Sequence, residues 1–311
     1  MSESDLQTAL TRHWGISDLS LEYRPVGAGS YHWSTPTHWI TVDRAPGEAA
    51  FARLDRALRT ARGLRLDFVV APLPTDQDRV LVRVAPGWAM SVFPLIDGVA
   101  GEFGEHPPED RAAVTDLLIA LHAVPLDGPA EADLPGSDLA RTDLRLPGRD
   151  RLEAALADAA LADAASGPWT SGPYAEPVRQ LLAGHAATIR AWLAEFDDLA
   201  AAVRAAGTDW VITHGEPHPG NILRTPTGLR MIDWDTVLVA PPERDLWMIP
   251  DQVARYAAGT GRAVTAAGLT LYRRWWALSD VTVYVTDLRR PHTAGGDAAD
   301  ALTYLSSYFS Q

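Results

Sequence analysis

The sequence contains no cysteine, no lysine and no apolar run long enough to cross a membrane. Without cysteine there is no disulfide, no thiolate zinc site and no cysteine nucleophile. The acidic start Met1–Leu6 lacks the basic and apolar regions of a signal peptide, and no transmembrane helix is expected. These absences favour a cytoplasmic protein without a membrane partner.

Because lysine is absent, arginine supplies all 27 basic side chains, against 40 acidic ones, and the net charge is -13. Such a chain has no surplus of positive charge to replace the counterions of a nucleic acid, so a nucleic-acid partner is not expected. The negative charge could attract a cationic small molecule, although solubility alone explains it more simply. The 311 residues, 47% of them apolar, suffice to bury a full core as one large domain or two lobes.

The N-terminal third is predicted to be rich in strands. Alternating apolar residues indicate strands at 19–26, 31–34, 37–43, 67–73, 79–84 and 88–93, with one helix from Pro46 to about Gly63. The turn of Gly27, Ala28, Gly29 and Ser30 lies between the first two strands. Such a turn can cover phosphates with its backbone amides, although a tight hairpin is its commoner meaning.

A boundary is predicted near residue 95, where Phe93–Gly98 leaves the last strand and breaks regular structure. Residues 1–95 would form an N-lobe and residues 96–311 a mainly helical C-lobe. Helical spacing indicates helices at 107–123, 151–165, 176–206, 251–258, 263–277 and 298–309. The segment 127–149 is predicted to be a long loop, of a length that is usually functional or disordered.

The most informative stretch runs from Asp209 to Trp247. Three short apolar runs (210–213, 221–223 and 229–232) are each followed by polar residues or a turn, which predicts short strands that deliver side chains to one end of the fold. The delivered side chains are His214, Glu216, His218, Asn221, Asp233 and Asp235. Carboxylate and amide oxygens suit Mg²⁺, which takes one or two of them and completes its shell with phosphate and water. The sequence therefore predicts a site for Mg²⁺ and a nucleotide.

Three motifs in this stretch resemble those of the aminoglycoside phosphotransferase family. They are T-H-G-E-P-H-P-G-N at Thr213–Asn221, I-D-W at Ile232–Trp234 and R-D-L at Arg244–Leu246. The resemblance implies an α+β, two-lobed protein-kinase-like fold and an enzyme that phosphorylates an alcohol group. The implied donor is ATP or GTP. The implied acceptor is a small hydroxylated molecule, for example a cationic one such as an aminoglycoside-type antibiotic, which would connect the chain with antibiotic resistance.

The resemblance also implies roles for individual residues. Asn221 and Asp233 would bind Mg²⁺, and Glu216 would orient or deprotonate the acceptor hydroxyl. His214 and His218 are further catalytic candidates, although bracing the loop is the more ordinary role for His214, and His218 could simply shape it. The nucleotide candidates are Gly27, Ala28, Gly29 and Ser30 over the phosphates, Arg44 beside them, and Phe93, Leu95 and Ile96 at the purine edge. Asp245 resembles the aspartate that supports the catalytic loop, and it could also cap the helix beginning there.

The chain departs from the family pattern at two places. Glu216 stands where the family has aspartate, which moves the carboxylate by roughly an ångström. The family also has a lysine on the strand after the glycine hairpin, and here that strand, Trp39–Asp43, offers no cation. We expect Asp43 to pair with an arginine of the next helix, such as Arg53. These departures leave a catalytically impaired, kinase-shaped binding protein as the alternative, and a sugar, amino alcohol or metabolite as a further acceptor class.

Overall fold

The computed structural model describes residues 3–17, 20–26, 29–126, 139–161, 167–207 and 209–310. It divides into two compact units, the first made of Met1–Thr142 and Asp209–Ala263 and the second of Asp143–Thr208 and Val264–Gln311. The boundary predicted at residue 95 divides the chain differently, into a strand-rich part and a helical part. That boundary stays a prediction. No helix of the described ranges is long and apolar enough to cross a membrane.

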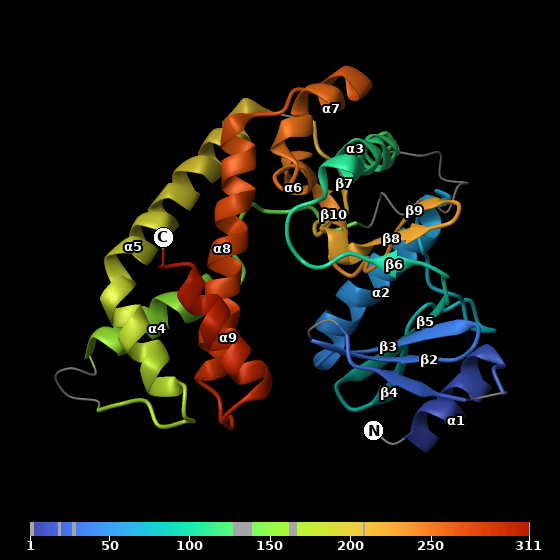
Figure 1. The fold of residues 1–311 in the computed structure, drawn as a ribbon, viewed down its shortest axis with the longest axis horizontal. Helices are drawn as coiled ribbons and strands as arrows, with labels where there is room; N and C mark the ends of the chain where they lie inside the picture. Colours follow the sequence, from blue (N-terminus) through green and yellow to red (C-terminus); the bar gives the residue numbers. More distant parts are fainter. Residues whose placement is uncertain are drawn as a thin grey trace. The chain divides into compact units, whose positions relative to one another are not determined.

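An antiparallel sheet of five strands opens the first unit, in the order β1-β2-β3-β5-β4 (Figure 1). Its strands are β1 (Glu22–Arg24), β2 (Ser30–Ser34), β3 (His38–Arg44), β4 (Val82–Ala85) and β5 (Trp88–Pro94). Helices α1 (Glu3–Trp14) and α2 (Gly47–Leu64) accompany it. The observed β2, β3, β4, β5 and α2 overlap the segments predicted from the sequence.

The two faces of this sheet differ in character. On one face, Leu6 and Leu10 of α1 pack with Ile40 and Val42 of β3 in a fully buried cluster. Since side chains alternate along a strand, the other face of β3 carries Asp43 and its neighbours two and four residues back. On that side, Ala89 and Phe93 of β5 pack with Leu54 and Leu58 of α2. The polar side chains of β3 therefore lie beside α2.

The rest of the first unit contains small sheets and helices that position the catalytic stretch. The first sheet has the order β6-β8-β9, formed by β6 (Val99–Ala100), β8 (Ile222–Thr225) and β9 (Gly228–Met231). The second pairs β7 (Val211–Thr213) with β10 (Leu238–Ala240). The helices are α3 (Pro108–His122), α6 (Glu243–Leu246) and α7 (Val253–Thr260), with the short turns η2 (Pro219–Asn221) and η3 (Pro250–Gln252).

The prediction of a strand at 67–73 is wrong. This segment makes only an isolated bridge between Val69 and Met231, beside which the N–H of Val70 donates to the Met231 carbonyl at 2.9 Å. Pro72 and Pro74 explain the difference, because proline has no N–H to donate to a strand ladder. The segment instead connects the N-terminal sheet to the strand that leads to Asp233.

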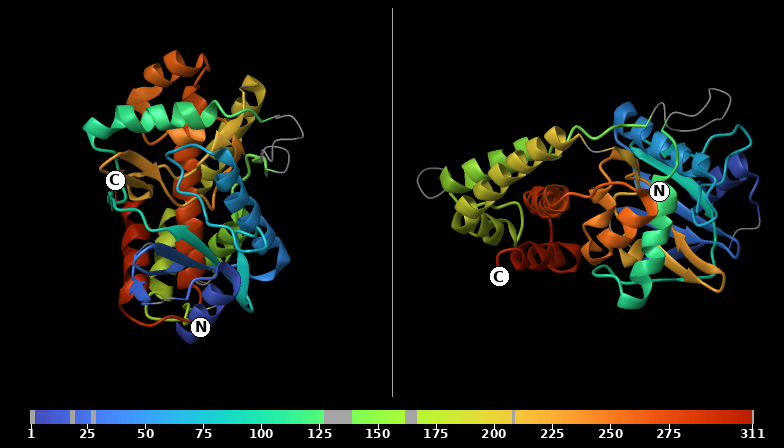
Figure 2. Two further views of the ribbon diagram at one scale, coloured as in Figure 1. Left: turned by 90° about the vertical axis from the view of Figure 1, so that its right-hand side faces the viewer. Right: turned by 90° about the horizontal axis from the view of Figure 1, so that it is seen from above.

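The second unit consists of helices in its described part (Figure 2). They are α4 (Arg149–Leu161), α5 (Ala175–Ala206), α8 (Ala266–Leu288) and α9 (Gly296–Ser307). Helix α5 contacts α4 and α8, and α8 contacts α9. The buried residues Leu182, Ile189, Leu193 and Phe196 keep a helical spacing on α5 and place its apolar side in the core. Gly207, at φ 59°, ends that helix.

Candidate active site

The loop that follows β7 is fixed by one buried carboxylate. Asp245, on the short helix α6, accepts the backbone N–H of His214 at 2.8 Å and that of Gly215 at 2.6 Å, one on each oxygen. Two amides that would otherwise be buried without a partner are thereby satisfied. The sequence-based expectation that Asp245 supports the catalytic loop corresponds to this contact.

Asp245 is itself held by residues that the sequence analysis did not identify. The Nε2 atom of His122, on α3, lies 3.0 Å from Oδ2 of Asp245, and its Nδ1 lies 2.9 Å from the hydroxyl of Tyr256 on α7. Burial alone would raise the pKa of Asp245, but the hydrogen bond and charge of His122, followed by Arg244, lower it overall. Asp245 is therefore ionised when it binds the loop. A lone histidine far upstream gives no sequence signal of this role.

Gly215 has to be glycine for two reasons. Its φ is 102°, a backbone conformation that residues with a side chain rarely adopt. A Cβ atom there would also collide with the guanidinium of Arg244. That guanidinium donates to Thr213 Oγ1 at 2.8 Å and to the Thr236 carbonyl at 3.0 Å, which ties β7 to the turn before β10.

His214 braces the loop from inside. Its side chain is fully buried, with Nε2 donating to the Ile232 carbonyl at 2.8 Å and Nδ1 accepting the N–H of Glu216 at 3.2 Å. The ring also packs edge-on against the buried Trp234, with centroids 4.6 Å apart. Burial lowers the pKa of His214, which fits a neutral ring with both nitrogens in use. These contacts agree with bracing, the more ordinary of its two predicted roles.

Asn221 presents an oxygen to the site. Its Nδ2 donates to the Glu216 carbonyl at 2.9 Å and lies 3.3 Å from Nε2 of His218. Both contacts use the amide nitrogen, so Oδ1 is the atom of this side chain that could act as a ligand. The Asn221 carbonyl accepts the N–H of Ile232 at 3.0 Å, so Asn221 and Asp233 are held close together.

Asp233 and Asp235 form the acidic side of the site. Asp233 has φ 63°, a left-handed conformation that costs free energy and is often found at functional positions. Asp235 lies on the turn after Trp234 and makes a hydrogen bond with Asp233. Desolvation first, and then the charges of Asp233, Glu216 and Asp43, raise the pKa of Asp235 well above its usual range.

These donors fit a Mg²⁺ ion that binds together with the phosphates of a nucleotide. Among the described residues, no group of three or more histidine and acidic side chains is arranged to hold a metal ion alone. An amide oxygen from Asn221 and a carboxylate from Asp233 are the one or two hard donors that Mg²⁺ takes from a protein when phosphates supply the rest. The assignment of these two residues as ligands stays a prediction.

The strand on which the family resemblance places a lysine carries the carboxylate of Asp43 in this chain. Asp43 accepts a hydrogen bond from the hydroxyl of Ser30, directly opposite it on β2. Burial raises the pKa of Asp43 to about 6, against the lowering effect of Ser30 and with a further raising effect of Asp233. The expected pairing with Arg53 is wrong: Arg53 is exposed, no arginine contributes to the pKa of Asp43, and the observed side-chain partner is Ser30.

The remaining nucleotide candidates have different surroundings. Arg44 is exposed, and its guanidinium lies 5.8 Å from the ring centroid of Trp88. Trp88 is directly opposite Arg44 in the pairing of β3 with β5. The N–H of Leu95 donates to the Thr37 carbonyl at 2.9 Å, which fixes the chain as it leaves β5. Phe93 packs against the apolar cluster that contains Leu54 and Leu58 of α2, and Ile96 is half-buried. Gly27 and Ala28 lie outside the described residues, and the contacts of all these residues with a nucleotide stay predictions.

His218 is half-buried in the loop. Its ring meets that of Phe103 edge-on, with centroids 4.9 Å apart. Burial, with smaller effects of His214 and His106, lowers the pKa of His218 to about 4. It is therefore neutral near pH 7, and a base with so low a pKa is weak. The loop is also held by His106, whose Nε2 lies 2.6 Å from the Pro217 carbonyl.

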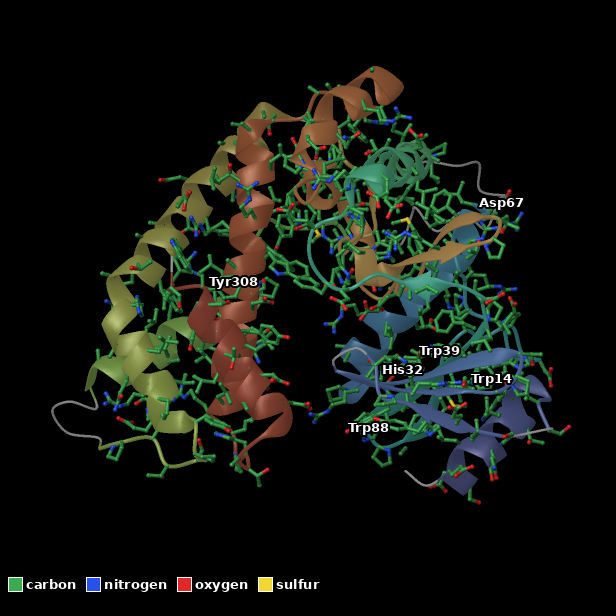
Figure 3. The ribbon with its side chains drawn as sticks, in the orientation of Figure 1. Trp14, His32, Trp39, Asp67, Trp88 and Tyr308 are labelled. Atoms are coloured by element: carbon green, nitrogen blue, oxygen red, sulfur yellow. The ribbon has the colours of Figure 1, made fainter. Side chains whose placement is uncertain are left out.

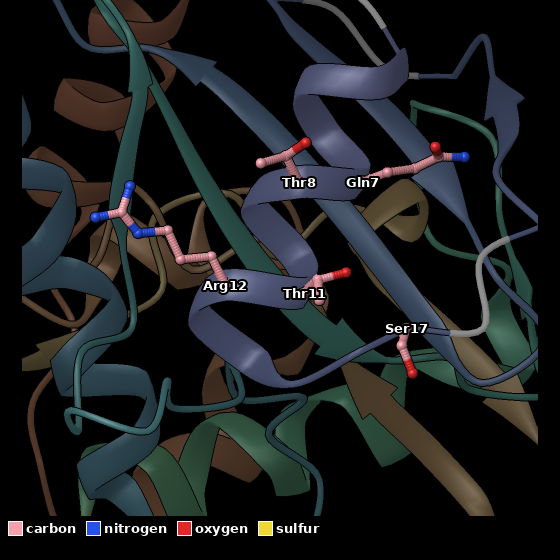
Figure 4. Close-up of a pocket in the computed structure, with 5 residues that line it drawn as sticks. All are labelled: Gln7, Thr8, Thr11, Arg12 and Ser17. Atoms are coloured by element: carbon pink, nitrogen blue, oxygen red, sulfur yellow. The ribbon is translucent and has the colours of Figure 1, made fainter.

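A separate hollow lies on the surface of α1 and contains none of the predicted site residues. It has a volume of about 580 Å³ and is lined by Gln7, Thr8, Thr11, Arg12 and Ser17 (Figure 4). The lining has no carboxylate, histidine or glycine turn. On the sheet face that bears Asp43, the rings of His32 and Trp39, labelled in Figure 3, lie with centroids 5.3 Å apart and planes tilted by 32°.

The fold and the loop together define a kinase-like small-molecule phosphotransferase. The sequence matches the phosphotransferase enzyme family over residues 33–278, and the chain belongs to that family. It is 32% identical over 295 residues to Protein StrN of Streptomyces griseus, covering 90% of this chain and 82% of that protein. The family and the enzyme class predicted from the motifs, a phosphotransferase with an alcohol group as acceptor, are thereby confirmed.

Solved structures show the same fold at lower identity. Spectinomycin phosphotransferase APH(9)-Ia, in complex with ADP and spectinomycin, superimposes with a TM-score of 0.73 at 18% identity, covering 100% of this chain and 95% of that one. A microcompartment-associated aminopropanol kinase gives a TM-score of 0.60 at 17% identity, covering 98% and 94%. The predicted α+β kinase-like fold, with an N-terminal antiparallel sheet and a helical C-terminal part, is confirmed.

Proposed function

We propose that the chain transfers the terminal phosphoryl group of ATP or GTP to a hydroxyl of a small molecule, with an aminoglycoside-type antibiotic or a related metabolite as acceptor. The observation that carries the proposal is the loop tied to Asp245, which presents Glu216 beside the oxygen donors of Asn221 and Asp233. One structure of APH(9)-Ia is a complex with ADP and spectinomycin, and another is a complex with AMP. This likeness supports a nucleotide donor and an antibiotic acceptor.

Each residue of the loop would have a distinct task. Asn221 and Asp233 would hold Mg²⁺, which when bound neutralises charge on the phosphate oxygens. Glu216, whose backbone is fixed on both sides by His214 and Asn221, would orient the acceptor hydroxyl and accept its proton. His218 would shape the loop, since its low pKa makes it a poor base at neutral pH.

The sheet would contribute the nucleotide contacts. Gly29, at φ 89°, and Ser30 stand at the start of β2, where backbone amides can approach phosphates closely. Leu95 and Ile96 follow β5 and would meet the purine edge with backbone groups. Because the N–H of Leu95 already bonds to Thr37, its carbonyl is the group that would face the purine.

A second function deserves a test because of one observation. Asp43 places a carboxylate on the strand where the related enzymes have lysine, and Glu216 replaces an aspartate. Both features favour a kinase-shaped protein that binds a nucleotide or another ligand without transferring phosphate. Only the kinase would form phosphorylated product. Nucleotide binding alone does not separate the two functions, because the alternative protein could also bind a nucleotide.

The deciding experiment measures phosphorylated product with ATP and with GTP over a panel of aminoglycosides, aminocyclitols, sugars and amino alcohols. We expect one acceptor class to be phosphorylated, and Asp233→Ala and Glu216→Ala to lower turnover by roughly 100-fold or more at unchanged folding. Asp198→Ala, an exposed acidic position on α5, is the matched control and should retain activity. Nucleotide binding without any product would favour the alternative, and neither binding nor product would contradict both the kinase and the nucleotide-binding form of the alternative.

A further inference from the structure

The catalytic loop is fixed at its start by Asp245, and its end meets a second segment of the chain. This segment is residues 101–106, which follow β6 and lead into α3 (Figure 1). β6 pairs antiparallel with β8, the strand into which the loop continues. Within the segment, the ring of Phe103 meets that of His218 edge-on. The segment and the loop therefore lie side by side.

The two prolines of the loop explain why it needs a partner from elsewhere. Pro217 and Pro219 have no N–H, so they cannot donate backbone hydrogen bonds that would close the loop on itself. The Pro219 carbonyl accepts the N–H of Gly101 at 2.9 Å, where an added Cβ atom would lie only 2.6 Å from Cβ of Pro219. The Pro217 carbonyl accepts from Nε2 of His106 at 2.6 Å. Residues 101–106 thus bind both proline carbonyls.

His106 is held in place by the start of α3. Its side chain is buried, and its carbonyl accepts Nε of Arg111 at 2.9 Å. Burial, ahead of smaller effects of its neighbours, lowers the pKa of His106, so the ring is neutral near pH 7 and carries one N–H. Because a carbonyl can only accept, that N–H is on Nε2. The single proton of the ring is therefore used on the loop.

Helix α3 holds both ends of the loop through histidines. His122, its last residue, contacts Asp245, which binds two backbone N–H groups at the start of the loop. His106 precedes the helix by two residues and binds the Pro217 carbonyl near the end of the loop. A helix has a fixed rise per residue, so these two contacts set the spacing between the ends of the loop. Glu216 lies between them.

We propose that His106 is a positioning residue for phosphoryl transfer, which keeps Glu216 in place beside the metal ligands by binding the Pro217 carbonyl. The proposal rests on the proposed function, which gives Glu216 its role. A carboxylate displaced by about 1 Å can lose roughly 100-fold in rate. Asn221 is held separately, because its carbonyl accepts the N–H of Ile232, so nucleotide binding should persist without the His106 contact.

The test separates the N–H donor of His106 from the shape of its ring. His106→Gln keeps an N–H at a similar reach, His106→Asn is one methylene too short to reach Pro217, and His106→Leu has no donor. Turnover is measured with ATP or GTP and the acceptor of the panel above that gives product. We expect His106→Asn and His106→Leu to lose about 10- to 100-fold in kcat, and His106→Gln to stay within about threefold.

Two controls distinguish positioning from a general loss of folding. The Kd of a non-hydrolysable analogue of the same nucleotide, measured with Mg²⁺ by calorimetry, should change by less than about threefold in each His106 variant. Val178→Ala removes two methyl groups from the buried side of α5 in the second unit. It should lower the melting temperature and keep kcat within about twofold.

The outcomes separate this proposal from the proposed function. Turnover of His106→Leu and His106→Asn within about twofold of the wild type would overturn the positioning role. Equal losses in His106→Gln and His106→Leu would also overturn it, because the ring's shape and not its N–H would then matter. If His106→Leu does not fold, the comparison of His106→Gln with His106→Asn decides. A wild type that forms no product with any acceptor would contradict the proposed function itself.

Discussion

Asp245 accepts the backbone N–H of Gly215 at 2.6 Å, and this contact fixes the start of the catalytic loop. The same carboxylate accepts the N–H of His214 and contacts His122. Three elements, β7, α3 and α6, are therefore joined at one fully buried anion. The position of Glu216 depends on this anion, although Asp245 itself is shielded from any substrate by burial.

Replacing Asp245 by asparagine should destabilise the chain strongly. One oxygen becomes an NH₂ group that faces a backbone N–H, so a buried donor loses its acceptor and His122 loses its charged partner. Breaking such a buried pair costs roughly 3–5 kcal/mol. The free energy of unfolding from urea denaturation measures the loss. Asp198→Asn should change it by less than about 0.5 kcal/mol, and equal stability of the two variants would contradict the tether.

Gly215→Ala should lower both stability and turnover. The added Cβ meets the guanidinium of Arg244, and φ 102° is unfavourable for alanine. Gly184→Ala is the matched control, because nothing lies within 4 Å of a Cβ at that helical position. It should stabilise the chain by up to about 1 kcal/mol. Thermal unfolding of the two variants checks the prediction, which is contradicted if their melting temperatures shift in the same direction.

The stability of the wild type should depend on pH through Asp43. Its pKa in the folded chain is about 6, raised from 3.8 by burial, so folding favours the protonated form. This contribution is fully present below pH 3.8 and is lost as the pH rises through 6. Relative to Asp43→Asn, the wild type should lose up to about 3 kcal/mol between those limits, less where solvent screens the carboxylate.

The measurement for Asp43 is urea denaturation from pH 4 to pH 7.5, in EDTA so that no divalent cation contributes. The difference between wild type and Asp43→Asn isolates this one group, because the other titrating groups occur in both chains. A difference that stays constant with pH, or that grows in favour of the wild type at higher pH, would contradict the raised pKa.

His218 and Glu216 should respond differently to substitution. With a pKa of about 4, His218 is neutral over the usual assay range. His218→Gln should therefore keep turnover within about tenfold and leave the pH profile unchanged, whereas Glu216→Gln should lose about 100-fold or more. The pH dependence of kcat/KM for both variants checks this. A profile that loses a limb in His218→Gln would make His218 the base.

The sequence predicted the family and the enzyme class because short motifs with fixed spacing carry the resemblance, whereas the roles of the single residues stay predictions. Asn221 and Asp233 lie in such motifs, and alternation along β3 correctly separated Asp43 from the buried Ile40 and Val42. His122 could not be found in this way, because its link to Asp245 spans 123 residues and follows from packing alone.

The partner of Asp43 illustrates a second limit of sequence reasoning. Charge complementarity favoured an arginine of α2, but the register of β2 and β3 places Ser30 directly opposite Asp43. Register depends on how a hairpin closes, and composition does not reveal it. The segment 67–73 was predicted wrongly for another reason, since its apolar residues resemble a strand while Pro72 and the following Pro74 interrupt the ladder.

The most direct test of the account is the melting temperature with and without Mg²⁺ and a nucleotide, for the wild type, Asp233→Ala and Asp198→Ala. A ligand that binds the native state stabilises it by about 2.7 kcal/mol at a hundredfold excess over Kd. The account predicts that Mg²⁺ with ATP or GTP raises the melting temperature of the wild type and of Asp198→Ala, and that Asp233→Ala loses most of this rise. An unchanged melting temperature of the wild type with both nucleotides at millimolar concentration would contradict it.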